Sequence, residues 1–84
     1  MLTGSGSGRR LEIVSTEPGV QVFTATDMEG PWIGKGGRPI PPSAGVAMET
    51  QHFPDSPNRP EFPSTVLRPG EVYSTTTLWR FSAR

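Results

Sequence analysis

Residues 71–81 read Glu-Val-Tyr-Ser-Thr-Thr-Thr-Leu-Trp-Arg-Phe, and this stretch decides the fold class. Tyr73, Trp79 and Phe81 fall on one side of an extended chain, because successive side chains of a strand point to opposite faces. Threonine and aromatic residues also favour strands. The stretch therefore predicts a strand over residues 71–81 whose aromatic side chains fill the apolar face of a sheet.

Three shorter runs have the same alternating character, at residues 10–15, 20–26 and 45–51. Glu17-Pro18-Gly19 is a strong turn signal between the first two runs, so we expect these to form a hairpin. No window carries apolar residues at helical spacing beyond two turns. The sequence thus predicts an all-β chain built from an antiparallel sheet.

Glycine and proline divide the chain, with ten of each among the 84 residues. They dominate residues 27–43 and recur through residues 53–63, where we expect long irregular loops. Regular strand pairing is not expected within residues 27–43. Residues 1–9 contain a Gly-Ser run and are expected to form a flexible lead without function, followed by the folded part at residues 10–84.

Charge and residue types exclude several classes of function. Eight basic and eight acidic residues cancel, which argues against nucleic acid as a partner. The chain has no cysteine and one histidine, so no protein-only metal site is expected. No segment is long and apolar enough for a membrane span or a signal peptide. We therefore expect a soluble, cytoplasmic protein without a membrane partner.

The most informative segment lies at residues 48–55, which read Met-Glu-Thr-Gln-His-Phe-Pro-Asp. Alternation places Glu49 and Gln51 on one strand face, where a carboxylate and an amide project together. Trp32 and Phe53 stand in the predicted loops and are candidates for ligand contact, because loops often carry binding residues. The alternative is an ordinary solvated strand face, since glutamate is mostly exposed in proteins.

Five motifs, taken together, point to a known family. In this order and spacing, over residues 10–82, they resemble the last part of the aldose 1-epimerase (galactose mutarotase) family: Glu17-Pro18-Gly19-Val20-Gln21, Gly34-Lys35-Gly36-Gly37, Glu49-Thr50-Gln51, Phe53-Pro54-Asp55-Ser56-Pro57-Asn58 and Leu67-Arg68-Pro69-Gly70-Glu71-Val72-Tyr73. The resemblance implies part of a large antiparallel β-sandwich. It also implies interconversion of the α and β anomers of aldoses such as galactose or glucose, without a cofactor.

The resemblance assigns roles to individual residues. Glu49 matches the glutamate that takes the proton from the anomeric hydroxyl, and Gln51, Phe53 and Trp32 become candidates for substrate binding. The family's acid, a histidine that protonates the ring oxygen, belongs to the upstream portion. His52 stands where relatives commonly have asparagine, so it is not the matching acid. The expected catalytic set is therefore incomplete.

Two other hypotheses stay open beside the enzyme. One is a non-catalytic β module that binds carbohydrate or assembles with itself. A few strands from a large sandwich leave free edges and an uncovered apolar face, so we expect a homo-oligomer formed through exposed strand edges. The other is a hydrolytic site at such an interface, built from His52, Asp55 and Glu49, and it ranks below the first two.

Overall fold

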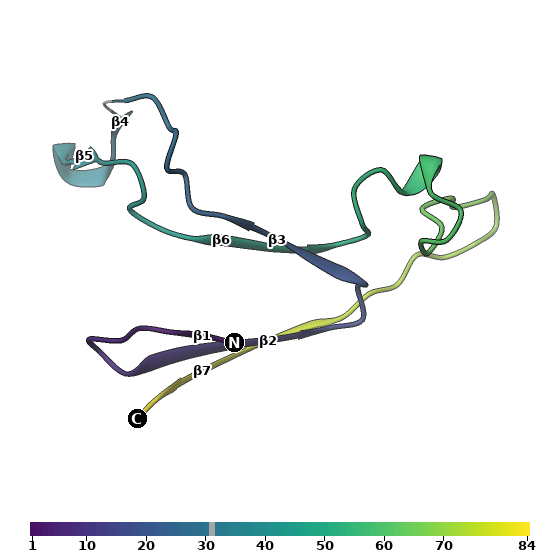
Figure 1. The fold of residues 1–84 in the computed structure, drawn as a ribbon, viewed down its shortest axis with the longest axis horizontal. Coiled ribbons are helices and arrows are strands. Elements are labelled where there is room, and N and C mark those ends of the chain that lie inside the picture. The colour runs from purple at the N-terminus through teal and green to yellow at the C-terminus, as the bar shows by residue number, and fades with distance from the viewer. Residues whose placement is uncertain (31) are drawn as a thin grey trace.

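The chain is built from short strands joined by long loops (Figure 1). The computed structural model describes residues 1–30 and 32–84. All strand pairs in this part of the chain are antiparallel, which confirms the predicted fold class. The strands and the two 3-10 turns are β1 (Leu2–Thr3), β2 (Arg9–Ser15), β3 (Gly19–Phe23), β4 (Trp32–Ile33), η1 (Lys35–Gly37), β5 (Pro39–Ile40), β6 (Ala47–Gln51), η2 (Ser56–Asn58) and β7 (Thr77–Ala83).

The expected hairpin between the first two long strands is wrong. β2 pairs with β7, so that Ile13 lies opposite Trp79. β3 pairs instead with β6, forming a separate two-stranded ribbon. Pairing with β7 uses all seven residues of β2, whereas β3 offers only five. The Glu-Pro-Gly segment consequently carries the chain from one sheet to the other (Figure 1).

The strand predicted over residues 71–81 runs instead over Thr77–Ala83. The start of β7 is set by its partner strand, because β2 ends at Ser15. One further backbone bond follows, from the Thr16 amide to the Thr76 carbonyl at 3.0 Å. Upstream of this point no strand lies alongside in the described structure, and the chain becomes an irregular strap over residues 60–76.

Two segments are more regular than the sequence indicates. Within residues 27–43, β4 and β5 form a small hairpin with Trp32 opposite Ile40, and Gly36 and Gly37 close its turn with φ of 75° and 72°. Within the predicted flexible lead, Leu2 and Thr3 form β1 against β2. Backbone bonds of 2.8 Å from the Gly4 and Gly8 amides close the intervening turn.

Two layers face each other across a small hollow of about 270 Å³. One layer is the sheet β1-β2-β7, and the other is the β3–β6 ribbon. Leu11 and Ile13 line the hollow from β2, and Val20 and Met48 line it from the ribbon. The layers are linked by the Thr77 hydroxyl on β7, which bonds Ser15 at 2.9 Å and Thr50 at 3.0 Å.

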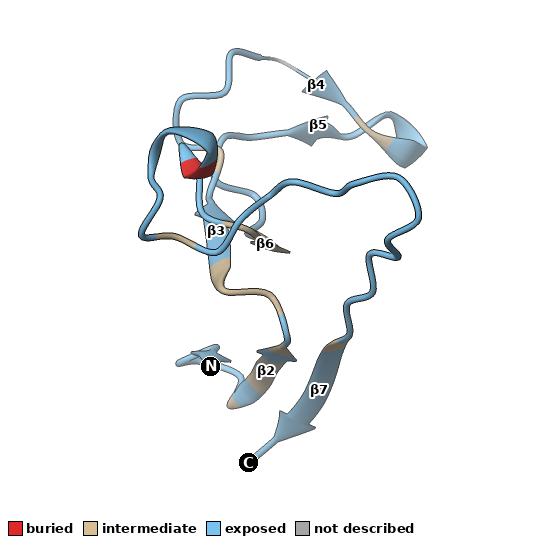
Figure 2. Cartoon of the chain, turned by 90° about the vertical axis from the view of Figure 1, so that its right-hand side faces the viewer, coloured by how far each residue is buried: buried red, intermediate tan, exposed pale blue. Residues whose placement is uncertain are grey.

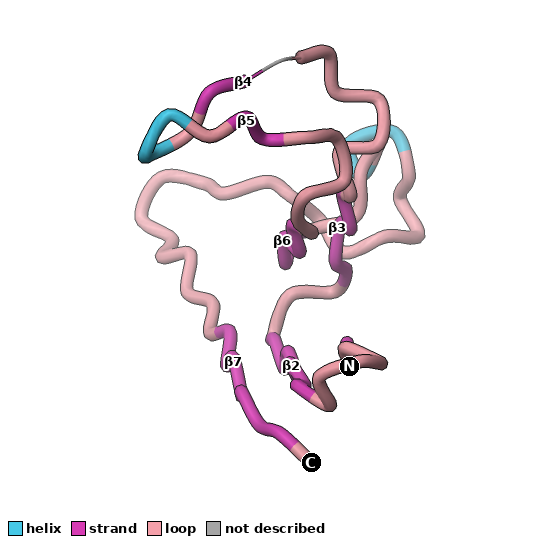
Figure 3. The backbone as a smooth tube through the Cα atoms, turned by 90° about the vertical axis from the view of Figure 1, so that its left-hand side faces the viewer, coloured by secondary structure: helices cyan, strands magenta, loops and turns pink. Residues whose placement is uncertain are grey.

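The outer faces of both layers are open. Among the described residues no hydrophobic side chain is buried, and Ser56 is the one buried residue (Figure 2). The radius of gyration is 17.2 Å, against about 12 Å for a compact domain of this length. Loops make up much of the backbone (Figure 3).

None of the helical turns in the described ranges is long and apolar enough to cross a membrane.

The hydroxyl link between the layers gives a stability prediction. Thr77→Val removes both side-chain bonds and leaves the hydroxyls of Ser15 and Thr50 without this partner. We expect a loss of about 1–2 kcal/mol in the free energy of unfolding, measured by urea titration. The control is Thr65→Val, on an exposed residue of the strap. Equal midpoints for the two variants would contradict a structural role for the link.

Candidate functional site

The candidate site lies on the face of the β3–β6 ribbon that points away from the other sheet, which we call the outer face. The register places Gln21 opposite Glu49 and Gly19 opposite Gln51. Directly opposite residues of an antiparallel pair share a face, so these four belong together. The alternate residues, such as Thr50, line the hollow against β2. The other sheet therefore does not cover the outer face.

Glu49 is exposed on this face, and its carboxylate forms no ion pair or hydrogen bond with any described residue. Gln51, two positions along β6, is half-buried. Together with Gln21 they offer one carboxylate and two amides along a single strip. An unpaired carboxylate can accept a proton, and amides can donate to or accept from sugar hydroxyls.

Gln21 is a site residue that sequence reasoning missed. Its position next to Glu49 depends on pairing between β3 and β6, whereas the sequence predicted that β3 would pair with β2. The available signal was the polar residue between Val20 and Val22, in an otherwise apolar strand. That signal predicts which face of β3 carries Gln21, but it does not predict which strand pairs with β3.

Phe53 joins the outer face at the Gln51 end. Its ring lies so close over Gly19 that a side-chain carbon added at Gly19 would come within 2.9 Å of the ring. The ring also packs against Phe62, with centroids 5.0 Å apart. Phe53 is 36% exposed, so it keeps an accessible apolar surface. Glycine at position 19 is what allows this close approach.

Trp32 is not brought to the same place. It lies on β4, with 55% of its surface exposed. The β4–β5 hairpin and the loop containing η2 are at opposite ends of the β3–β6 ribbon, and both rise away from the β1-β2-β7 sheet (Figure 1). A hollow of about 290 Å³ near this end is lined by Ile40, Phe23 and Ala47, and Trp32 is not among its lining residues. Trp32 and Phe53 therefore belong to segments at opposite ends of the ribbon (Figure 1).

His52 and Asp55 do not form the acid–base pair that a hydrolytic site would need. The His52 Nδ1 atom lies 3.1 Å from the Glu17 Oε2 atom. Asp55 instead accepts hydrogen bonds from Asn58 at 2.6 Å and from Arg59 at 3.2 Å. No group of three or more potential metal ligands occurs in residues 1–30 and 32–84. The hydrolytic hypothesis thus loses its geometric basis.

The contact between Phe53 and Gly19 can be tested by substitution. Gly19→Ala places a methyl group 2.9 Å from the ring and forces Phe53 away from the outer face. We expect a loss of about 1–3 kcal/mol in the free energy of unfolding, measured by urea titration. Gly45→Ala is the matched control, because nothing lies within 4 Å of its added carbon. Equal effects of the two substitutions would contradict the close packing.

Sequence comparisons show which known proteins this chain is similar to. A family model described as aldose 1-epimerase matches residues 1–80. Galactose mutarotase from Mus musculus is 47% identical over 78 residues, and the human protein of that name is 46% identical over 78 residues. Each match covers 93% of this chain and 23% of the relative.

A bacterial relative shows the same relationship. Aldose 1-epimerase from Escherichia coli (strain K12) is 37% identical over 76 residues, covering 88% of this chain and 22% of the relative. The chain therefore spans less than a quarter of the length of these relatives. Because the family model covers nearly the whole sequence, the chain belongs to the aldose 1-epimerase family.

Proposed function

We propose that this chain supplies the base-bearing face of an aldose 1-epimerase, a site that interconverts the α and β anomers of an aldose such as galactose. The observation that carries the proposal is the register placing Glu49 opposite Gln21, with Gln51 next in line on the outer face. The names of the relatives, galactose mutarotase and aldose 1-epimerase, support the choice of reaction and of substrate class.

Glu49 acts as the general base in this proposal. Its carboxylate takes the proton from the hydroxyl at the anomeric carbon, while an acid protonates the ring oxygen and the ring opens. Rotation about the bond to the anomeric carbon and closure on the other face give the second anomer. Gln21 and Gln51 hold sugar hydroxyls, and Phe53 presents its ring to the apolar C–H groups of the sugar.

The acid has to come from outside the outer face. His52 is the single histidine of the chain, and its Nδ1 atom is directed at Glu17 rather than at Glu49. We assign the acid to the part of the longer relatives that this chain does not match. The chain alone is then expected to supply a base without its acid, and acid–base partners contribute about 10²- to 10⁴-fold each.

A chimera tests the function. Mouse galactose mutarotase, with its matching segment replaced by this chain, is expected to interconvert galactose anomers in polarimetry. Glu49→Gln in the chimera should lower the rate by about 10²- to 10⁴-fold, because it removes the base. Glu12→Gln is the control, since Glu12 is an exposed carboxylate on β2. A Glu49→Gln chimera as active as the Glu12→Gln chimera would reject the assignment.

We also propose that the isolated chain forms a homo-oligomer through its free strand edges. β7 is the last strand of its sheet, so one of its edges has no strand beside it in the described structure. Phe81 and Trp79 on β7 expose 76% and 47% of their surface. Unpaired edges and exposed apolar side chains both favour association with another copy. This observation also favours the alternative of a non-catalytic, self-assembling module.

A charge on the edge strand should block this association. For the unmodified chain, light scattering after size exclusion should give a mass that is a multiple of 9.1 kDa and falls on dilution. Phe81→Lys should shift it toward the monomer, because edge lysines oppose strand pairing. Val72→Lys is the control, since Val72 is 88% exposed but lies outside the strands. A monomeric unmodified chain would refute the oligomer.

A further inference from the structure

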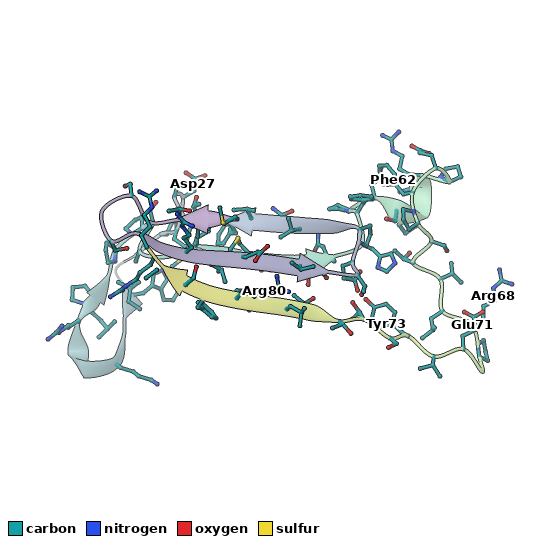
Figure 4. All side chains as sticks on the ribbon, turned by 90° about the horizontal axis from the view of Figure 1, so that it is seen from below. Asp27, Phe62, Arg68, Glu71, Tyr73 and Arg80 are labelled. Carbon is teal, nitrogen blue, oxygen red and sulfur yellow. The ribbon has the colours of Figure 1, made fainter. Side chains whose placement is uncertain are left out.

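Beside the outer face, three polar side chains meet in a cluster that the proposed chemistry leaves unused. Glu17, His52 and Tyr73 form this cluster, which we call the clasp. The Nδ1 atom of His52 lies 3.1 Å from Oε2 of Glu17, and the Tyr73 hydroxyl donates a hydrogen bond to Oε1. Figure 4 shows Tyr73 where the strap approaches the start of β7. The clasp thus joins three segments that are distant in sequence.

Burial sets the Glu17–His52 contact apart from the arginine–carboxylate pairs. The Glu17 side chain is 4% exposed and that of His52 is 27% exposed. The partners of the two arginine–carboxylate pairs in the described ranges are all 48% exposed or more. Exposed pairs contribute little to stability, whereas removing one partner of a buried charge is costly. The Oε1 atom of Glu17 accepts the hydrogen bond from Tyr73, and the buried Oε2 atom has the His52 ring nitrogen at 3.1 Å but no hydrogen bond of good geometry.

The clasp is connected to the sugar-facing residues through the backbone. His52 stands directly between Gln51 and Phe53, where β6 ends. Glu17 is followed by Pro18, whose ring fixes its own backbone, and then by Gly19 beneath the Phe53 ring. Both strands of the ribbon are therefore held at the end that carries Gln51 and Phe53.

We propose that Glu17 is a positioning residue for the sugar site: by binding His52 and Tyr73 it keeps Gln51 and Phe53 aligned with Glu49. This inference rests on the proposed function for its consequence on sugar binding. The claim that Glu17 fixes the positions of Gln51 and Phe53 depends only on the contacts of the clasp. Glu17 does not touch the substrate in this arrangement, and its effect passes through His52 to the neighbours on either side.

An NMR signature reports the geometry directly on the chain. Because the Phe53 ring lies over Gly19, the Gly19 α-protons should be shifted upfield by the ring current, and Phe53→Leu identifies this shift by removing it. We expect Glu17→Ala to abolish the upfield shift. Glu17→Gln should reduce it in part, because the amide oxygen still accepts from Tyr73 but the charge facing His52 is lost. The Trp79 indole signal, on β7, should stay in place and show that the fold persists.

Kinetics of the mouse chimera report the consequence for function. Glu17→Gln should raise KM for galactose about two- to tenfold, the effect expected from one weakened hydrogen-bonding partner. The value of kcat should change by less than about twofold, because the base and the acid are untouched. Glu12→Gln is again the matched control, because its carboxylate pairs with Arg80 at 3.4 Å on the other sheet.

Two results would overturn the inference. One is a Gly19 signal at its original position in folded Glu17→Ala. The other is an unchanged KM in the Glu17→Gln chimera. An inactive unmodified chimera counts against the proposed function alone, because the glycine signal is measured on the chain itself and still decides whether the clasp positions Phe53.

Discussion

The ladder between β2 and β7 is the constraint on which the rest of the structure depends. It joins residues near the two ends of the chain, and the hydroxyl bond between Ser15 and Thr77 spans 62 positions. Every element between these strands belongs to one large loop closed by this pairing (Figure 3). Closing such a loop has an entropic cost that later contacts must offset. The β3–β6 ribbon contributes by stacking on the closed sheet through Thr50.

The sequence was sufficient for the fold class and for the faces of individual strands. Alternation correctly placed Glu49 and Gln51 side by side, because the two-residue period of a strand is a local property. Partner choice is not local. Whether β3 pairs with β2 or with β6 depends on how many residues each partner offers, and that decision also determined whether Gln21 would be recognised. The small β4–β5 hairpin was missed for a related reason, since its glycine-rich turn resembles that of an unpaired loop.

The candidate site illustrates the same limit at the level of side chains. Phe53 was predicted from its place in a loop, and the structure adds the reason it can approach the strand, which is the missing side chain at Gly19. Trp32 was predicted by the same argument but lies on a separate hairpin. The role of His52 changed most: its partner is Glu17, whose burial could not be read from a turn motif. Long-range packing therefore decides which predicted residues cooperate.

The separation between β2 and β7 also has a consequence for synthesis on the ribosome. β3 and β6 are complete once residue 51 has emerged, so the ribbon bearing Glu49 can pair while the rest of the chain is still being made. β2 is made before this ribbon but has no long partner in the described structure until β7, at residues 77–83, has left the exit tunnel. During that interval the edge of β2 that later pairs with β7 is bare, and unpaired strand edges make a nascent chain prone to aggregate. The strands that carry the surface proposed to bind sugar are thus synthesised before the sheet that supports them is complete.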